Sequence, residues 1–324
     1  MLFGVALAAP ALAQTAGTYT PPAHVDGWPG LASGETQAEM QASFRLGPEL
    51  QRGRSAKWTL AEHRRLAAAL AALGKQTPGK VDAFVVSAGL DSDPVFGREA
   101  REAGKVLAAR YGAAGRTLVL AGTDGSKPSD LPGGSIESVT LALARVAELM
   151  DPKEDVLVLY LTSHGAPIGI AYHDGDEGYG ILSPARLAAM LDELGIRNRL
   201  LILSACYSGV FVPHVAGGST AVLTAASSSK PSFGCKSDND WTFFGDALIN
   251  HALRKAQPLD AAAKEAQATI AKWEADARLD PSGPQTSIGG DVARWLAPLE
   301  AAMPKVASKP VGRPATDALA PDGG

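Results

Sequence analysis

The stretch Leu200-Leu-Ile-Leu-Ser-Ala-Cys-Tyr-Ser-Gly209 decides the fold. Its first four residues form an apolar run that is too short for a helix and is typical of a strand buried in a parallel sheet. The small residues that follow let the backbone turn sharply at the carboxyl end of the strand, where open α/β sheets carry their chemistry. Cys206 therefore lies where a nucleophile would be placed. On this stretch alone, a small buried thiol that fills space is an equal alternative.

Strand-like and helix-like segments alternate on both sides of this stretch. Besides 200–205, the sequence predicts strands at 81–88, 117–121, 156–162 and 220–225, and helices at 95–111, 135–150, 184–194, 241–253 and 259–278. A short hairpin is expected from 168–172 and 180–182. This order predicts an α/β fold, a three-layer sandwich with helices on both faces of a mostly parallel central sheet of about six strands.

The composition is that of an ordinary soluble globular protein. Of 324 residues, 46% are hydrophobic and 20% are charged, and the net charge of −4 offers no electrostatic reason to bind nucleic acid or an anionic membrane. Two cysteines do not make a disulfide framework. The six histidines are scattered without the spacing of metal ligands. We therefore expect neither a metal nor another cofactor.

The N-terminal residues resemble the end of an export signal. Residues 1–13 are apolar and finish with Ala11-Leu12-Ala13, a small-x-small cleavage pattern, and they are too short to span a bilayer. The sequence therefore predicts a signal-peptide remnant and a periplasmic or secreted protein without a membrane span. The alternative for this segment is a buried N-terminal strand or helix.

The rest of the chain divides by composition into four segments. We expect a Pro- and Gly-rich linker at 14–34, an N-terminal helical segment at 35–78 with helices at 35–50 and 59–73, the main domain at 79–300 and a tail at 301–324. The tail is rich in Pro, Ala, Gly and Lys and cannot bury enough apolar surface to order itself, so it is predicted to be disordered.

A second chemical motif follows the predicted strand at 156–162. This strand ends Thr162-Ser163-His164-Gly165, and consecutive strands of a βαβ unit are commonly neighbours, so His164 and Cys206 are expected to face each other across one crevice. A cysteine needs a base or a cationic neighbour to be a thiolate at neutral pH, and imidazole serves both roles. The competing interpretation is a satisfied core histidine beside an inert thiol.

These motifs resemble the legumain-type cysteine peptidase family. The resemblance rests on His164-Gly165 after one apolar strand and on Ser-Ala-Cys-Tyr-Ser-Gly at 204–209 after the next, and it extends through 221–227, 233–235 and 243–246. The family includes the catalytic subunit of the GPI transamidase and shares its fold with caspases and gingipains. Similarity covers roughly 81–253 and is greatest to the short bacterial members, which implies a caspase-like sandwich.

The resemblance implies a role for each matching residue. Cys206 corresponds to the nucleophile and His164 to the general base, which then protonates the leaving amine. The backbone N–H groups of Gly165 and Cys206 would form the oxyanion hole, where a glycine lets the carbonyl approach the backbone. In legumains an Asn near the end of the first strand orients the histidine. Here that strand ends Ser87-Ala88-Gly89, without an Asn.

The resemblance also implies a specificity pocket. Legumains build it from an Arg after the first strand, an acid two residues before the nucleophile and an Asp in a downstream Gly-Asp step. Arg98 and Asp246 match the first and last of these, and Ser204 stands in place of the acid. The pocket would then hold one carboxylate in place of two. Asparagine specificity does not follow, and a basic or small polar residue before the scissile bond is an alternative.

The sequence leaves three functions to be distinguished. The first is a cysteine endopeptidase that acts on a peptide or protein through a Cys206 thioester. The second is a transamidase or ligase in which an amine accepts the same thioester. The third is an idle fold used for binding.

The regulation of the protein is also open. N-terminal helices that cover the crevice would make the protein a zymogen, and a disulfide between Cys206 and Cys235 would inactivate the thiol. The oligomeric state is not indicated.

Overall fold

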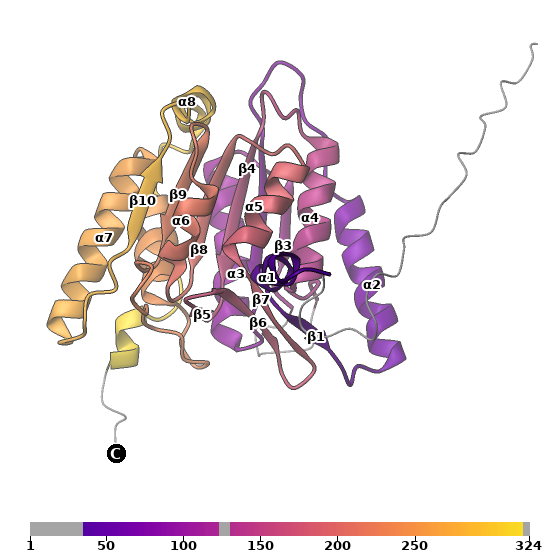
Figure 1. Ribbon diagram of the computed structural model, residues 1–324. Coiled ribbons are helices and arrows are strands. Elements are labelled where there is room, and N and C mark those ends of the chain that lie inside the picture. Colours follow the sequence, from indigo (N-terminus) through magenta and orange to yellow (C-terminus); the bar gives the residue numbers. More distant parts are fainter. Residues whose placement is uncertain (1–34, 123–129, 320–324) are drawn as a thin grey trace, which may run out of the picture.

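The computed structural model describes residues 35–122 and 130–319, and its centre is a six-stranded sheet with the order β10-β9-β8-β4-β2-β3 (Figure 1). The strands are β2 (Ala83–Gly89), β3 (Thr117–Leu120), β4 (Val156–Thr162), β8 (Arg199–Ser204), β9 (Thr220–Thr224) and β10 (Gln285–Ile288). The first five pair in parallel and β10 joins the edge antiparallel. This sheet confirms the predicted α/β fold. The expected signal remnant and linker, at 1–34, lie outside the described residues.

Helices cover both faces of the sheet, and alternate strand residues decide which face each side chain enters. Val156, Val158 and Tyr160 of β4 pack in one cluster, whereas the intervening leucines pack in the other. The first face carries α3 (Pro94–Arg110), α7 (Leu259–Asp276), α8 (Ala293–Ala302), the π-helical Gly245–His251 and the 3-10 turn Ala252–Arg254. The second carries α4 (Ile136–Leu149), α5 (Pro184–Glu193) and α6 (Val212–Val215), with α2 (Ala56–Ala71) packed outside α4.

A second, antiparallel sheet lies against the carboxyl edge of the first. Its order is β1-β7-β6-β5, with β1 (Glu49–Gln51), β5 (Gly165–Ala166), β6 (Gly169–Asp174) and β7 (Gly178–Leu182). The predicted helix at 35–50 is therefore two elements, α1 (Gln37–Arg45) and β1. Gly47 separates them in a left-handed conformation, with φ of +87°, where a Cβ would lie 2.3 Å from Ile181 O.

The C-terminal residues to 319 lie along the domain, although the composition of 301–324 predicted disorder. Val311 O accepts hydrogen bonds from Trp241 Nε1 at 2.8 Å and from Asn250 Nδ2 at 3.0 Å. Ala315 is buried and its N–H donates to Asp246 at 2.8 Å. These polar contacts to buried partners order a segment whose own composition offers few apolar side chains. A last 3-10 turn spans Ala315–Leu319.

The predicted helix at 241–253 begins later than its sequence pattern indicated. Helical residues start at Phe243 and continue into the π-helical Gly245–His251, and Gly245 N donates to Thr242 Oγ1 at 3.0 Å. The backbone before it is held by other contacts, which include a hydrogen bond from Phe243 N to Phe233 O. Within 35–122 and 130–319, no helix is both long enough and apolar enough to cross a membrane.

Candidate active site

The pairing of β4 with β8 places His164 and Cys206 at the same edge of the sheet. Thr162 and Ser204 are register partners, and each stands two residues before one of the two chemical residues. Tyr207 follows Cys206 in the left-handed conformation, with φ of 57°, so the chain turns sharply there. Gly165 lies against this turn, since a Cβ on it would be 2.0 Å from Cys206 O. The two strand ends therefore form one compact edge.

The Cys206 sulfur lies among hydrogen-bond donors. Ser232 N donates to Sγ at 3.2 Å, and Ser232 Oγ lies 3.8 Å from the same sulfur. A hydrogen bond from the Cys235 thiol, the Ser232 contacts and the charge of His164 together lower the pKa of Cys206 to about 6, against the opposing effect of burial. The pKa of Cys235 is raised well above its ordinary value, mainly because its thiol donates a hydrogen bond to Cys206. These contacts favour the thiolate form of Cys206, which is the nucleophilic form of a cysteine.

The pH dependence of alkylation is expected to report this low pKa. Iodoacetamide reacts with the thiolate, so the rate at Cys206 should rise with pH to half its maximum at about pH 6. Cys235→Ala removes the largest stabilising contact and should move the midpoint upward. Cys235→Ser keeps a donor and should stay nearer the wild-type midpoint. Mass spectrometry of the Cys206 peptide measures the rate, and equal midpoints for Cys235→Ala and the wild type would contradict the assignment.

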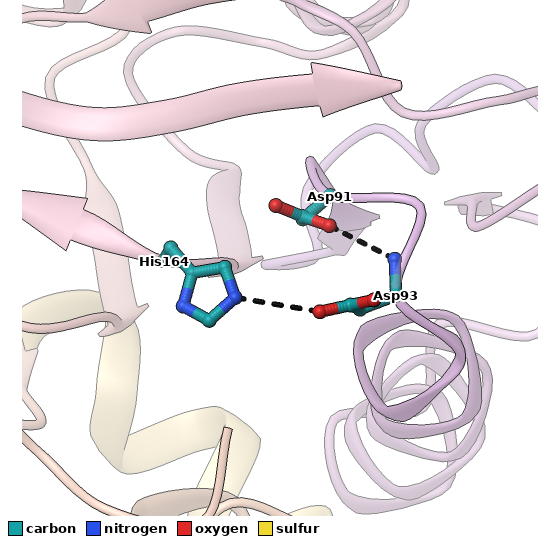
Figure 2. A group of neighbouring side chains, drawn as sticks. All are labelled: Asp91, Asp93 and His164. Carbon is teal, nitrogen blue, oxygen red and sulfur yellow. Dashed lines mark hydrogen bonds and ion pairs between the residues drawn. The ribbon is translucent and has the colours of Figure 1, made fainter. Parts of the chain in front are cut away.

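His164 is held on one side by a carboxylate that the sequence search missed. Its Nε2 lies 3.5 Å from Asp93 Oδ2, and Nδ1 is left on the other side of the ring (Figure 2). Asp93 immediately precedes α3, and its N–H donates to Asp91 Oδ1 at 2.9 Å. Phe96 packs edge-on against the imidazole, with ring centroids 5.0 Å apart. The signal in the sequence is Asp-Ser-Asp-Pro at 91–94, between strand and helix and a few residues beyond Gly89.

Asp91, Asp93 and His164 together form a group that could hold a cation. One ligand atom from each residue lies within 4.8 Å of the others (Figure 2). Asp91 is buried, and burial raises the pKa of its carboxyl group. Asp91 also faces His173 Nδ1 at 3.4 Å. A metal in this group would occupy the imidazole nitrogen that faces Asp93, so it would compete with the role of His164 as a free base.

The three residues predicted for the specificity pocket make different contacts. Ser204 is buried below Cys206 on the face that α3 covers. Arg98 anchors the 231–241 loop, because its guanidinium donates to Ser237 O at 2.6 Å and to Asn239 O at 3.2 Å. Asp246 is fully buried and accepts from Asn250 Nδ2 and Ala315 N, each at 2.8 Å. The Asp246 carboxylate thus ties the C-terminal segment to the core.

Another carboxylate, that of Glu99 on α3, occupies the place below the nucleophile. Glu99 is fully buried, and its Oε1 accepts from Tyr160 Oη at 2.5 Å, from Thr162 Oγ1 at 2.7 Å and from Ser204 Oγ at 2.9 Å. Thr242 N donates to Oε2 at 2.8 Å. The sequence does not indicate a role for Glu99, because this residue lies inside an amphipathic helix, where a glutamate is ordinarily an exposed surface charge.

Residues 137–290, which hold His164, Gly165 and Cys206, match the Peptidase C13 family. This match confirms the resemblance that the motifs indicated. Among solved structures, caspase-1 from Spodoptera frugiperda superposes with a TM-score of 0.43 at 14% identity, over 67% of this chain and 88% of that chain. No curated protein matches the chain.

Proposed function

We propose that this chain, a cysteine peptidase of the legumain-like C13 family, hydrolyses peptide bonds through a thioester at Cys206, with His164 as general base and then general acid. The observation that carries the proposal is the register of β4 with β8. It brings an imidazole and a cysteine of lowered pKa to one sheet edge, each two residues beyond a paired position. A nucleophile and a base on adjacent strand ends support the proposal, because covalent catalysis needs these two groups close together.

In the first half of the reaction His164 takes the proton of the Cys206 thiol, and the sulfur attacks the carbonyl carbon of the scissile bond. A tetrahedral oxyanion forms, and we assign its stabilisation to the backbone N–H groups of Gly165 and Cys206, two residues that pack against each other at the turn. The carbon–nitrogen bond then breaks as His164 gives a proton to the leaving amine. The acyl group remains on Cys206 as a thioester.

In the second half, water replaces the departed amine. His164 takes a proton from the water, and the resulting hydroxide adds to the thioester carbon. The carbon–sulfur bond breaks, and the carboxylic acid product leaves Cys206 as a thiolate. The contact between Asp93 and His164 supports a positioning role for Asp93, since a carboxylate on one ring nitrogen fixes the imidazole orientation and stabilises its protonated form.

Product analysis tests this function directly. A peptide mixture incubated with the protein in H₂¹⁸O should yield fragments whose new carboxyl termini carry ¹⁸O, and Cys206→Ala should yield none. Added hydroxylamine should divert part of the product to hydroxamates through the same thioester. Products that appear only when an amine is present would instead identify a transamidase or ligase. Absence of any product that depends on Cys206 would favour the binding module.

A further inference from the structure

The segment between β2 and α3 brings two carboxylates to one side of His164. In the pairing of β2 with β4, Gly89 is the register partner of Thr162. Asp91 and His164 each lie two residues beyond this pair. Leu90 N donates to Thr162 O at 2.9 Å, which continues the pairing past the strand end. The sheet itself therefore sets the position of Asp91 beside the imidazole.

Asp91, Asp93 and His164 form a donor set that suits a zinc ion. Figure 2 shows the three side chains turned toward one another, and within residues 35–122 and 130–319 one ligand atom from each lies within 4.8 Å of the other two. Zinc binds imidazole nitrogen and carboxylate oxygen, and its four-coordinate sites commonly include a water molecule. Calcium and magnesium prefer oxygen ligands alone, so the imidazole favours zinc over both.

The spacing between His164 and Asp93 leaves room for a shared ion. His164 Nε2 lies 3.5 Å from Asp93 Oδ2. A hydrogen bond between a nitrogen and an oxygen is ordinarily about 2.9 Å long, so the pair is separated by more than a good hydrogen bond requires. Two ligand atoms that each lie about 2.1 Å from a tetrahedral zinc ion are about 3.4 Å apart. An ion between these two atoms would therefore require little movement of either side chain.

Other groups hold each of the two carboxylates in place. Ser237 Oγ donates to Asp93 Oδ1 at 2.7 Å, which leaves Oδ2 to face the imidazole. Asp93 N donates to Asp91 Oδ1 at 2.9 Å, and His173 Nδ1 lies 3.4 Å from Asp91 Oδ2. Contacts of this kind orient metal ligands, and their loss typically costs about 10- to 100-fold in metal affinity. The carboxylates are thus oriented without an ion between them.

The group is open to solvent on one side and closed on the other. The side chains of His164 and Asp93 are 44% and 40% exposed, whereas that of Asp91 is 2% exposed. An ion can therefore enter from the exposed side, where a water molecule can complete its coordination. A buried carboxylate is costly unless a charge of opposite sign compensates it, and a bound cation would supply that charge to Asp91.

From this geometry we propose that Asp91, Asp93 and His164 form a regulatory zinc site, and that the bound ion switches the peptidase off. The ion takes the lone pair of His164 Nε2, so the single proton of the neutral imidazole lies on Nδ1. Neither nitrogen can then accept a proton, and His164 no longer acts as a general base. Zinc binding does not depend on the proposed function, whereas the inhibition rests on it.

Zinc binding is measured in a protein without thiols, because Cys206 and Cys235 are themselves potential zinc ligands. Calorimetric titration of the Cys206→Ala/Cys235→Ala protein with ZnCl₂ should show one bound ion per molecule. Asp91→Asn, added to this protein, should weaken the affinity at least about 10-fold, because the amide keeps the shape of the carboxylate without its charge. Asp174→Asn is the matched control, since it removes an acid of β6 outside the group, and it should leave the affinity unchanged.

Inhibition is measured in the protein with both cysteines. Turnover of a peptide substrate should fall as ZnCl₂ is added and should recover when the chelator EDTA is added. Asp91→Asn should need at least about 10-fold more zinc for half-inhibition, relative to its own turnover without zinc. CaCl₂ at the same concentrations should not inhibit, because calcium prefers oxygen ligands.

The outcomes separate the zinc site from the proposed function. Equal zinc affinities with and without Asp91→Asn, or binding that requires the cysteines, would overturn the site. Binding to the thiol-free protein without any effect on wild-type turnover would overturn the regulatory role. Turnover that does not depend on Cys206 would overturn the proposed function, while the titration still decides the zinc site. If Asp91→Asn does not fold, His164→Ala replaces it in the titration and should lose affinity to a similar extent.

Discussion

Cys206→Ala is expected to lower kcat by about 10⁴-fold or more, because the reaction has no other route to a thioester. His164→Ala should produce a loss of similar size, since nucleophile and base act as one unit, and the double variant should be no worse than either single one. Cys206 and His164 follow the paired strands and are not among the paired residues, so both variants should stay folded. Turnover of a peptide substrate and thermal unfolding are measured for each variant.

Two further variants sharpen this result. Asp93→Ala should lower kcat by less than His164→Ala, because the imidazole loses its positioning partner and keeps its chemistry. His214→Ala is the matched control, since His214 is an exposed histidine on α6 away from the paired strand ends. Its turnover should equal that of the wild type. Retention of wild-type turnover by Cys206→Ala would show that the nucleophile lies elsewhere.

Gly165→Ala is expected to lower kcat by about 10²- to 10³-fold, the size of effect that follows the loss of one oxyanion-hole donor. An added Cβ would lie 2.0 Å from Cys206 O and 3.1 Å from Ala205 Cβ. The first of these atoms belongs to the backbone and cannot rotate away, so the turn that carries the nucleophile must shift. Alkylation by iodoacetamide needs no oxyanion hole and should persist.

The control for this variant is Gly290→Ala. A Cβ on Gly290 meets no atom within 4 Å, and its φ lies outside the left-handed region. Gly290→Ala should therefore leave kcat and the unfolding temperature unchanged, whereas Gly165→Ala should lower both. A kcat for Gly165→Ala within about twofold of the wild type would contradict the placement of the oxyanion hole at this turn.

Strands that are buried on both faces were predictable from the chain alone. β4 has the bounds that its apolar run predicted, because all seven residues lie in the core. β1 and β10 were missed, since Glu49–Gln51 and Gln285–Ile288 are short and carry polar side chains at exposed positions. Such edge strands exist because a neighbouring backbone offers them partners, and this information is absent from their own pattern.

The candidate site likewise contains residues that local sequence predicts and residues that only packing brings into place. Cys206, His164 and Gly165 each follow a strong strand directly, so local sequence identifies them and parallel pairing with short connections makes them neighbours. Asp93 immediately precedes α3 and Glu99 lies within it, yet one faces an imidazole and the other lies in the core and accepts from a serine. Which turn of an amphipathic helix meets which strand depends on packing between the layers, and no spacing along the chain encodes it.

Local patterns alone were thus enough to predict the parallel sheet, the thiol at the end of β8 and the imidazole beside it. Packing decided what surrounds these residues: the carboxylate that faces His164, the second thiol that lowers the pKa of Cys206, and the buried Glu99 to which Ser204 donates. The physical reason is that hydrophobic periodicity specifies which face of an element is buried, whereas hydrogen bonds and charges act between atoms that only the folded chain brings within a few ångströms.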